Sequence, residues 1–558
     1  MKVIIIGGVA GGASAAARLR RLDEQAEIIL LERGSYISFA NCGLPYFLGD
    51  IITEEAALTL QTPESFTSRF NVQIRTNQEA LAVHPAKKEV EIYDSIQDRR
   101  YTETYDALLL SPGAAPVRPP MEGIDSKRVF TLRTIPDARQ IKELISTQKP
   151  RNAIVVGGGY IGLEVAENLV HAGVQTTIIE LADHVIAALD ADIAAEVQEY
   201  IRQKGIRLFT GDGVTRIVEN EVGLTVYTKD AHLTCDLLIM GVGVRPDTKF
   251  LQDSGIELTA RGAIRVDSKM RTNFPDIYAV GDAVEVTQFV TKSPAYIPLA
   301  GPANRQGRIA ADAIAGQESV YEGTQGTAIV RLFDMTVATT GINEAAAKAA
   351  GISYDKTYIY APSHAGYYPG AQNMSIKILW AADSKKILGV QIAGYEGVDK
   401  RIDVLATAMR LGADITMLKN LELSYAPPFG SAKDPVNMLG FVAENSIQGL
   451  VSQFCWDEVD SLPRDGSVTL LDVRTKAEVR RGSIPGFSNI PLDELRGHLE
   501  ELPKEKPVYV HCQSGLRSYN ACRILSGYGY TCYNLAGGYR LYHIIGENRA
   551  QQEEVYEH

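Results

Sequence analysis

The fold is decided by two stretches that read alike, KVIIIGGVAGGASAAARLRRL at Lys2–Leu22 and NAIVVGGGYIGLEVAENLV at Asn152–Val170. Each begins with a short apolar run, passes through clustered glycines and continues as an amphipathic segment, which is the pattern of a buried strand that turns into a helix. Each is followed by a second apolar run that ends in an acid, EIILLE at Glu27–Glu32 and QTTIIE at Gln175–Glu180. The chain therefore contains the same strand, turn, helix and strand twice.

This repeated unit is the fingerprint of a dinucleotide-binding βαβ fold. Its glycines let the backbone approach a pyrophosphate, its helix N-terminus offers unpaired N–H groups, and the acid about 20 residues later accepts hydrogen bonds from a ribose. The first copy departs from the pattern because Val9 occupies the central glycine position. The predicted nucleotide-binding residues are Gly7, Gly11, Gly12 and Glu32 in the first copy, and Gly157, Gly159, Gly162 and Glu180 in the second.

Length and composition limit the remaining functions. At about 150 residues per domain, 558 residues indicate about three or four domains. The formal charge of −12 argues against nucleic acid and membrane partners. Neither a signal peptide nor an apolar run of about 18 residues is present, so we expect a cytoplasmic protein. Six cysteines without a disulfide framework or paired zinc-ligand spacing predict no metal site.

Further segments extend the pattern: LLLSPG at Leu108–Gly113, GVGVRP at Gly241–Pro246 and TNFPDIYAVGDA at Thr272–Ala283. Together with the two fingerprints they make residues 1 to about 445 resemble the flavin-dependent pyridine nucleotide disulfide oxidoreductases. The resemblance implies FAD at the first site and NAD(P)H at the second. Glu180 favours NADH over NADPH because a carboxylate repels a 2′-phosphate. The resemblance adds Arg33, Asn41, Ser111, Pro112, Gly113, Gly281 and Asp282 to the FAD site, and Tyr160, Glu164 and Gly243 to the NAD site.

The segment YISFANCGLPYFLGD at Tyr36–Asp50 carries one cysteine, Cys42, where many relatives have C-x4-C and this chain has Phe47. It resembles the single-cysteine subgroup that contains coenzyme A disulfide reductases, NADH-dependent persulfide reductases and NADH oxidases. This implies that Cys42 alternates between a thiolate and a mixed disulfide with coenzyme A. Ala10 stands where the oxidase branch usually has a histidine. The coenzyme A residues implied by the motifs are Ser14, Arg18, Arg21, Ser38, Asn41, Arg308 and Lys433.

From Thr327 the sequence resembles the dimerisation domain of the same family, which implies a homodimer in which the partner completes each active site. Tyr367 in HAGYYPGA and Tyr425 in LSYAPPFGSAKDP match tyrosines that lie near the substrate sulfur in coenzyme A disulfide reductases. A phenol can donate a proton to a leaving thiolate, so we predict a catalytic role for both. Packing in the core is the alternative for the two tyrosines, and His364 is an alternative acid.

The C-terminal part resembles a single rhodanese domain, with VTLLDVRTKAEVRRGSIPGF at Val468–Phe487 and HCQSGLRS at His511–Ser518. A strand delivers Cys512 to a loop whose inward N–H groups form a cradle for a persulfide anion. Four residues separate Cys512 from Arg517, one fewer than in related phosphatases, which favours sulfur over phosphate. The catalytic cysteine is Cys512 and the loop residues are Gln513, Ser514, Gly515, Leu516, Arg517 and Ser518.

The predicted fold class is α/β, with two Rossmann-like nucleotide-binding domains, an α+β dimerisation domain and a C-terminal α/β rhodanese domain. The predicted boundaries are 1–112 and 250–326 for the FAD domain, 113–249 for the NAD(P)H domain, 327–446 for the dimerisation domain and 453–550 for the rhodanese domain.

The predicted function is reduction of coenzyme A disulfide, coenzyme A persulfide or polysulfide by NAD(P)H through FAD and Cys42, with Cys512 handling sulfane sulfur. A bound pantetheine arm would carry sulfur between the two cysteines. Two alternatives remain: an NADH oxidase that uses a sulfenic acid at Cys42, and a non-enzymatic sensor of sulfane sulfur.

Overall fold

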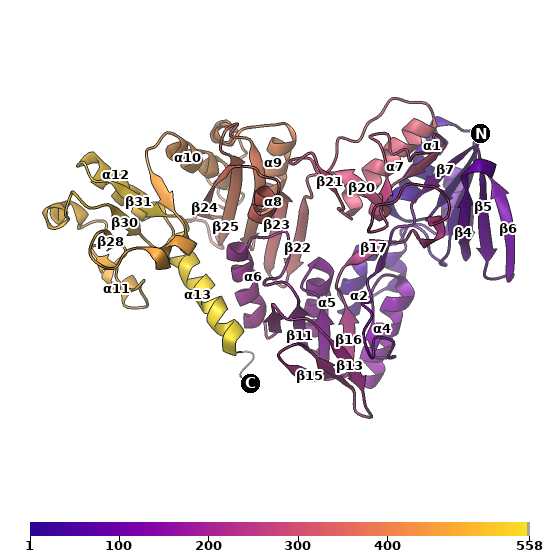
Figure 1. Cartoon of the computed structure of the whole chain (residues 1–558), viewed down its shortest axis with the longest axis horizontal. Helices are drawn as coiled ribbons and strands as arrows, with labels where there is room; N and C mark the ends of the chain where they lie inside the picture. The colour runs from indigo at the N-terminus through magenta and orange to yellow at the C-terminus, as the bar shows by residue number, and fades with distance from the viewer. Residues whose placement is uncertain (555–558) are drawn as a thin grey trace. The chain divides into compact units, whose positions relative to one another are not determined.

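The computed structural model describes residues 1–554 and divides into two compact units (Figure 1). Unit 1 contains Met1–Leu181 and Asp212–Gly326, and unit 2 contains Ala182–Gly211 together with the chain from Thr327 onward. Both units mix helices with sheets, so the predicted α/β class is confirmed. Every helix in the described part of the chain is too short or too polar to traverse a lipid bilayer.

The first repeated unit forms a five-stranded parallel sheet in unit 1. Its strand order is β19 (Ile277–Ala279), β7 (Ala107–Leu110), β1 (Lys2–Ile6), β2 (Glu27–Glu32) and β3 (Gln73–Thr76). Helix α1 (Ala10–Leu22) buries its alanines and packs on α7 (Ala300–Ile314). The two helices approach closely because both have glycine at the crossing: a Cβ on Gly307 would lie 2.3 Å from the Gly11 carbonyl oxygen.

The second repeated unit forms the same arrangement. Strand β10 (Asn152–Val156) lies between β11 (Gln175–Glu180) and β16 (Leu237–Met240), β16 pairs with β9 (Val129–Phe130), and all pairings are parallel. Helix α5 (Tyr160–His171) follows β10 directly, as the glycine motif predicted.

Two three-stranded antiparallel sheets and several shorter elements complete unit 1. The sheets are β4 (Gln78–His84), β5 (Glu89–Asp94) and β6 (Arg99–Thr104), and β13 (Arg216–Glu219), β14 (Leu224–Tyr227) and β15 (His232–Cys235). The short elements are α2 (Leu44–Leu48), α3 (Pro63–Phe70), α4 (Ile135–Gln148), β8 (Ala114–Pro116), β17 (Val244–Pro246), β18 (Ile264–Arg265), β20 (Val284–Thr287) and β21 (Pro294–Ala295).

Unit 2 contains an antiparallel sheet and a parallel one. The antiparallel order is β22 (Ala328–Leu332), β23 (Met335–Gly341), β26 (Ile387–Gly394), β25 (Asn373–Ala381) and β24 (Tyr354–Pro362). Helices α9 (Val398–Arg410) and α10 (Pro435–Ile447) pack on this sheet. Short elements of the unit are β12 (Arg207–Thr210) and α8 (Glu344–Ala349).

The parallel sheet of unit 2 corresponds to the predicted rhodanese domain. Its order is β27 (Ser452–Phe454), β31 (Cys532–Leu535), β30 (Val508–His511), β28 (Thr469–Asp472) and β29 (Ser488–Asn489). Strand β30 ends immediately before Cys512, and α12 (Leu516–Gly527) begins four residues after that cysteine. The other helices are α11 (Lys476–Val479) and α13 (Gly538–Glu554).

A buried charge cluster attaches α6 (Ala191–Gln203) to the antiparallel sheet of unit 2. The fully buried Lys377 on β25 lies 2.9 Å from Asp190, 2.7 Å from Asp192 and 2.5 Å from Glu344. A buried lysine needs such partners, because an unpaired buried charge costs several kcal/mol. The segment Ala182–Gly211, which the sequence analysis placed in the NAD(P)H domain, therefore makes these contacts within unit 2. The four-domain division itself stays a prediction.

Helix α13 joins the rhodanese sheet to α6. The Gln198 side chain on α6 donates to Asn548 on α13 at 2.9 Å. Arg540 lies 3.4 Å from the buried Glu196 of α6, and its guanidinium stands 4.6 Å from the ring centre of Tyr360 on β24. These contacts hold α13 against α6, and the first residues of α13 also hydrogen-bond the Cys512 loop.

Candidate active sites

Both nucleotide fingerprints adopt the predicted local geometry. The Glu32 carboxylate accepts a hydrogen bond from the Gly8 N–H at 3.0 Å, and Glu180 accepts the equivalent bond from Gly158 at 2.5 Å. Gly7 has φ of +98°, and a Cβ there would lie 2.0 Å from the Ser111 carbonyl oxygen, so only glycine fits. A Cβ on Gly159 would meet no atom within 4 Å. The turn is therefore open on the side from which a dinucleotide approaches.

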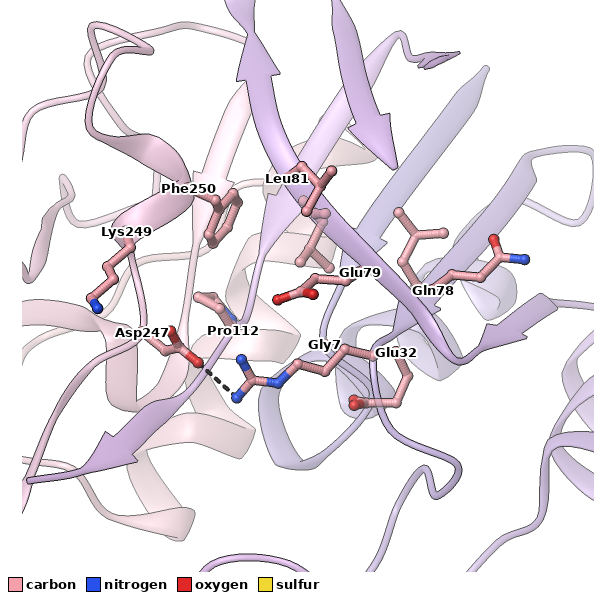
Figure 2. Close-up of a pocket in the computed structure, with 13 residues that line it drawn as sticks. Gly7, Glu32, Gln78, Glu79, Leu81, Pro112, Asp247, Lys249 and Phe250 are labelled. Atoms are coloured by element: carbon pink, nitrogen blue, oxygen red, sulfur yellow. Dashed lines mark ion pairs between the residues drawn. The ribbon is translucent and has the colours of Figure 1, made fainter. Parts of the chain in front are cut away.

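A cavity of about 490 Å³ lies at the carboxyl ends of β1 and β2 (Figure 2). This is where open α/β sheets bind nucleotides, and the volume is within the usual range for such sites. The predicted residues Gly7, Glu32, Arg33 and Pro112 line it. Other lining residues were not predicted, because they come from segments distant in sequence: Glu79, Leu81, Asp247, Lys249 and Phe250. Arg33 is held by Asp247 at 2.7 Å. These residues fit the adenosine end of FAD.

The remaining predicted FAD residues converge near the same strand ends. A Cβ on Gly11 would lie 2.9 Å from Ser111 Oγ, and one on Gly113 would lie 3.0 Å from Arg133 Nη2. The Gly281 N–H donates to Gln306 at 2.7 Å. Arg133 Nη2 lies 3.8 Å from Asp282, and burial raises the pKa of Asp282 while Arg133 opposes that shift.

Cys42 lies in a short 3₁₀ helix at Asn41–Gly43 that leads into α2. All six cysteines are free among the described residues, and Cys42 is the exposed one. Desolvation of its sulfur is the largest effect and raises its pKa, the carboxylates of Glu164 and Asp282 raise it further, and Arg133 lowers it. The structure therefore brings one predicted FAD residue, Asp282, and one predicted NAD residue, Glu164, into the electrostatic surroundings of the predicted redox thiol.

Asn41 and Arg133 support this arrangement. With its amide oriented to satisfy both partners, the Asn41 side chain donates to the Phe39 carbonyl and accepts from Arg133 Nη1, each at 3.0 Å. Arg133 was not among the predicted site residues, because it comes after the first βαβ unit and belongs to no glycine motif. It nevertheless contacts both Asn41 and Asp282.

A tyrosine and a glutamate form a hydrogen-bonded pair beside Cys42. The Tyr46 hydroxyl donates to Glu164 Oε1 at 3.0 Å. Burial raises the pKa of Glu164 to about 7, although the Tyr46 hydrogen bond lowers it, and the charge of Glu167 adds to the increase. Tyr46 was missed by the sequence analysis. Its position four residues after Cys42, at the spacing of one helical turn, was the available signal.

Replacing Glu164 by glutamine is expected to lower the pKa of Cys42, because the carboxylate opposes ionisation of the thiol. Wild-type Glu164 is charged only above pH about 7, so the two proteins should differ above that pH and converge below it. The measurement is the pH dependence of iodoacetamide labelling of Cys42 in the reduced, FAD-loaded protein. Glu318→Gln, on the exposed Lys269 pair, is the control. An unchanged or higher labelling midpoint in Glu164→Gln contradicts the prediction.

Two of the predicted coenzyme A residues of unit 1, Ser14 and Arg18, lie at the contact between α1 and α7. Ser14 hydrogen-bonds Asn304, and Arg18 Nε pairs with Asp312 at 2.7 Å. The Arg21 guanidinium lies 5.5 Å from the Phe70 ring centre, and Arg308 is exposed on α7. The Ser38 N–H donates to the Gly8 carbonyl at 2.8 Å with φ of +46°. Lys433 is exposed in unit 2. Their coenzyme A roles stay a prediction.

The two predicted catalytic tyrosines lie together in unit 2. The hydroxyls of Tyr367 and Tyr425 are 2.8 Å apart. The side chains are 75% and 48% exposed, so they do not pack in the core. His364 is buried and packs edge-on against Tyr368, 5.5 Å between ring centres. The tyrosine pair, rather than His364, is presented at the surface.

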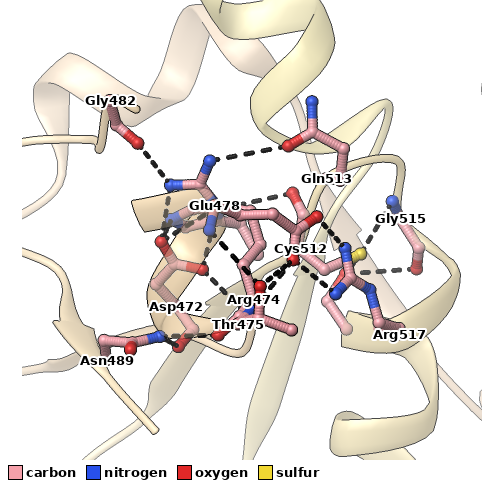
Figure 3. Close-up of polar contacts among 12 residues, drawn as sticks. Asp472, Arg474, Thr475, Glu478, Gly482, Asn489, Cys512, Gln513, Gly515 and Arg517 are labelled. Atoms are coloured by element: carbon pink, nitrogen blue, oxygen red, sulfur yellow. Dashed lines mark hydrogen bonds and ion pairs between the residues drawn. The ribbon is translucent and has the colours of Figure 1, made fainter. Parts of the chain in front are cut away.

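Two groups that follow Cys512 in its loop and in α12 donate hydrogen bonds to the Cys512 sulfur (Figure 3). The Cys512 sulfur accepts hydrogen bonds from the Gly515 N–H at 3.1 Å and the Ser518 hydroxyl at 3.3 Å. The first N–H groups of α13 hold the loop from behind, since Tyr539 donates to the Cys512 carbonyl at 2.8 Å and Arg540 to that of Gln513 at 3.0 Å. The loop is thus fixed with its sulfur facing hydrogen-bond donors.

Two arginines beside this loop each have a carboxylate partner. Arg517 binds Glu478 through both terminal nitrogens, at 2.8 and 2.6 Å. Arg474 is 1% exposed and contacts Asp472 at 2.7 Å, and its other terminal nitrogen lies 3.5 Å from Gln513. Neither Glu478 nor Arg474 was among the predicted site residues. The spacing T-x-x-E at Thr475 predicts a helix cap there, but it does not predict the contact with Arg517.

Comparison with known proteins agrees with this geometry. The model of the pyridine nucleotide-disulphide oxidoreductases matches residues 1–307, the model of their dimerisation domain matches 327–435, and the rhodanese-like domain matches 456–544. A coenzyme A disulfide reductase of Staphylococcus haemolyticus is 35% identical over 445 residues, which cover 80% of this chain and 99% of that protein.

Two solved structures are similar over almost the full length. The reduced CoADR-RHD of Bacillus anthracis has a TM-score of 0.96 and 47% identity, and covers 98% of each chain. An NAD-dependent persulfide reductase from A. fulgidus has a TM-score of 0.91 and 35% identity, and covers 97% of this chain and all of that one. The chain therefore belongs to the pyridine nucleotide-disulphide oxidoreductase family and carries a C-terminal rhodanese-like domain.

Proposed function

We propose that this protein uses NADH to reduce coenzyme A disulfide, coenzyme A persulfide or polysulfide, with Cys42 as its redox thiol and Cys512 as a carrier of sulfane sulfur. The observation that carries the proposal is the free Cys42 thiol in the electrostatic surroundings of Asp282 and Glu164. The activities named for the similar proteins, coenzyme A disulfide reductase and persulfide reductase, support the same substrate class. FAD and NAD(P)H are the cofactors that the family implies.

The residues of the chain divide the proposed work. The Cys42 thiolate attacks the substrate disulfide, so that a mixed disulfide with coenzyme A forms and a thiolate leaves. When bound and reduced by NADH, FAD would supply the two electrons that break the S–S bond of the mixed disulfide, which returns Cys42 to the thiolate and releases coenzyme A as a thiol. Glu180, at the ribose position, favours NADH. The dimerisation domain supports a homodimer, in which Tyr367 and Tyr425 of one subunit would donate to the leaving thiolate at the other.

Anaerobic oxidation of NADH, followed with each sulfur substrate in turn, tests this function. We expect steady turnover of the FAD-loaded protein with coenzyme A disulfide or coenzyme A persulfide and none without substrate. Consumption of NADH that requires oxygen would instead identify an oxidase, and the absence of turnover under both conditions would favour a sensor. If Cys42 reduces a disulfide, the rate should follow the disulfide concentration and not the oxygen concentration.

A further inference from the structure

The two arginines beside Cys512, Arg517 and Arg474, are each already paired with a carboxylate. Arg517 belongs to the loop, yet its guanidinium is bound by both oxygens of Glu478, at 2.8 and 2.6 Å. Arg474 is paired with Asp472, and both are almost fully buried. Burial lowers the pKa of His511 to about 4, so its imidazole is neutral near pH 7. The cradle therefore offers the sulfur neutral donors, the Gly515 N–H and the Ser518 hydroxyl.

This charge balance discriminates between sulfur donors. Once Cys512 is a thiolate, the site carries one net negative charge among these groups. A dianion such as thiosulfate would be repelled by this negative charge, because like charges in a partly desolvated site repel. Neither arginine would offset the repulsion, because each is already paired with a carboxylate. A persulfide at the end of a neutral organic arm brings less charge to the reacting sulfur. Leu516, 62% exposed beside Arg517, offers an apolar contact for such an arm.

We propose that Glu478 determines the donor specificity of Cys512, selecting thiol-borne persulfides over thiosulfate by occupying Arg517. This inference rests on the proposed role of Cys512 as a sulfur carrier. In the transfer, the Cys512 thiolate attacks the outer sulfur of R–S–SH, the S–S bond of the donor breaks, Cys512–S–SH forms and R–S⁻ leaves. With thiosulfate the same attack would release sulfite. Neither step needs an oxidant or a reductant, because the sulfane sulfur atom is only transferred from the donor to Cys512.

Glu478→Gln tests the proposal. Glu478 also accepts hydrogen bonds from the Thr475 N–H at 2.9 Å and the Thr475 hydroxyl at 2.8 Å, which caps α11. Glutamine can keep this cap, because glutamine is accepted at that position of a capping box. Its NH₂ group would then face Arg517 Nη2, so Arg517 would lose that hydrogen bond and the negative charge beside it, while Nη1 would keep its bond to the oxygen that caps α11. We expect the ratio of kcat/KM for thiosulfate to kcat/KM for pantetheine persulfide, whose arm is uncharged, to rise about tenfold, which corresponds to about 1.4 kcal/mol of added attraction between thiosulfate and an Arg517 that is no longer neutralised.

The assay uses the full-length, FAD-loaded protein and measures transfer of sulfur to cyanide, with loading of Cys512 checked by intact mass. Thr475→Ala is the matched control, because it weakens the cap and keeps Glu478 on Arg517, so its donor ratio should stay within about twofold of wild type. Glu478→Gln combined with Arg517→Gln should lose the gain, because no freed cation remains.

A second measurement needs no variant. Because the proposal predicts repulsion, kcat/KM of the wild type for thiosulfate should increase with salt, whereas attraction by a free arginine would make it decrease. A donor ratio unchanged in Glu478→Gln, a gain that survives loss of Arg517, or a decrease with salt would each overturn the role of Glu478. Failure of Cys512 to take sulfur from either donor would overturn the carrier function as well.

Discussion

Cys42→Ser is expected to abolish NADH-driven reduction of coenzyme A disulfide, lowering kcat/KM by roughly 10³-fold or more, as loss of a covalent nucleophile does in other enzymes. A serine hydroxyl cannot form a disulfide. No second thiol replaces the lost one, because Phe47 occupies the position of the usual partner cysteine. The other cysteines in the described part of the chain are buried or half-buried and belong to other segments. The measurement is anaerobic loss of NADH absorbance with coenzyme A disulfide.

The matched control is Cys455→Ser, a half-buried cysteine of unit 2 that lies in neither nucleotide motif. It should keep the wild-type rate. Addition of NADH should still bleach the flavin absorbance of Cys42→Ser, which separates loss of the thiol from loss of the cofactor site. Equal reductase rates in wild type and Cys42→Ser would remove the proposed mechanism.

The nucleotide-binding folds were predictable because their signals are local. A strand, a glycine turn and a helix occupy fewer than about 30 adjacent residues, and steric fit dictates the glycines. The clash of a Cβ on Gly7 with the Ser111 carbonyl is an example. The Cys512 loop was predictable for the same reason, since Gly515 and Ser518 follow the cysteine within six residues.

The contacts that tune each site were not predictable from local pattern. Tyr46 and Glu164 are 118 residues apart in sequence, and Arg517 and Glu478 are 39 apart. Nothing in the spacing of either pair indicates that they meet, because the fold alone brings them together. Glu478 also caps α11. A glutamate at this position is therefore already explained by the cap, and its residue type does not indicate the contact with Arg517.

The position of α6 illustrates the same limit. It follows the second fingerprint and lies within the predicted NAD(P)H domain. Its N-terminal acids, Asp190 and Asp192, bind Lys377, which lies more than 180 residues further along the chain, and no local pattern predicts that contact. Charged residues are usually exposed, so a sequence pattern does not predict that Lys377 is fully buried or which carboxylates pair with it.

Cys512→Ser is expected to eliminate transfer of sulfane sulfur from a persulfide donor to cyanide, again by roughly 10³-fold or more. The Cys512 sulfur is buried and accepts hydrogen bonds from the Gly515 N–H and the Ser518 hydroxyl, which stabilise negative charge on that sulfur. A serine at this position cannot form a persulfide, because its side chain ends in oxygen. The measurement is thiocyanate formation by the full-length protein, with intact mass reporting whether a sulfur atom is gained.

The same variant separates the two sulfur sites. Reduction of coenzyme A disulfide needs no sulfane sulfur, so it should continue in Cys512→Ser, whereas Cys42→Ser should lose reduction and keep transfer to cyanide. If Cys512→Ser also slows NADH oxidation with coenzyme A persulfide, the rhodanese cysteine delivers sulfur to Cys42. If that rate is unaltered, Cys42 takes its persulfide directly and Cys512 serves a separate acceptor. Retention of cyanide transfer in Cys512→Ser would refute the carrier role of this cysteine.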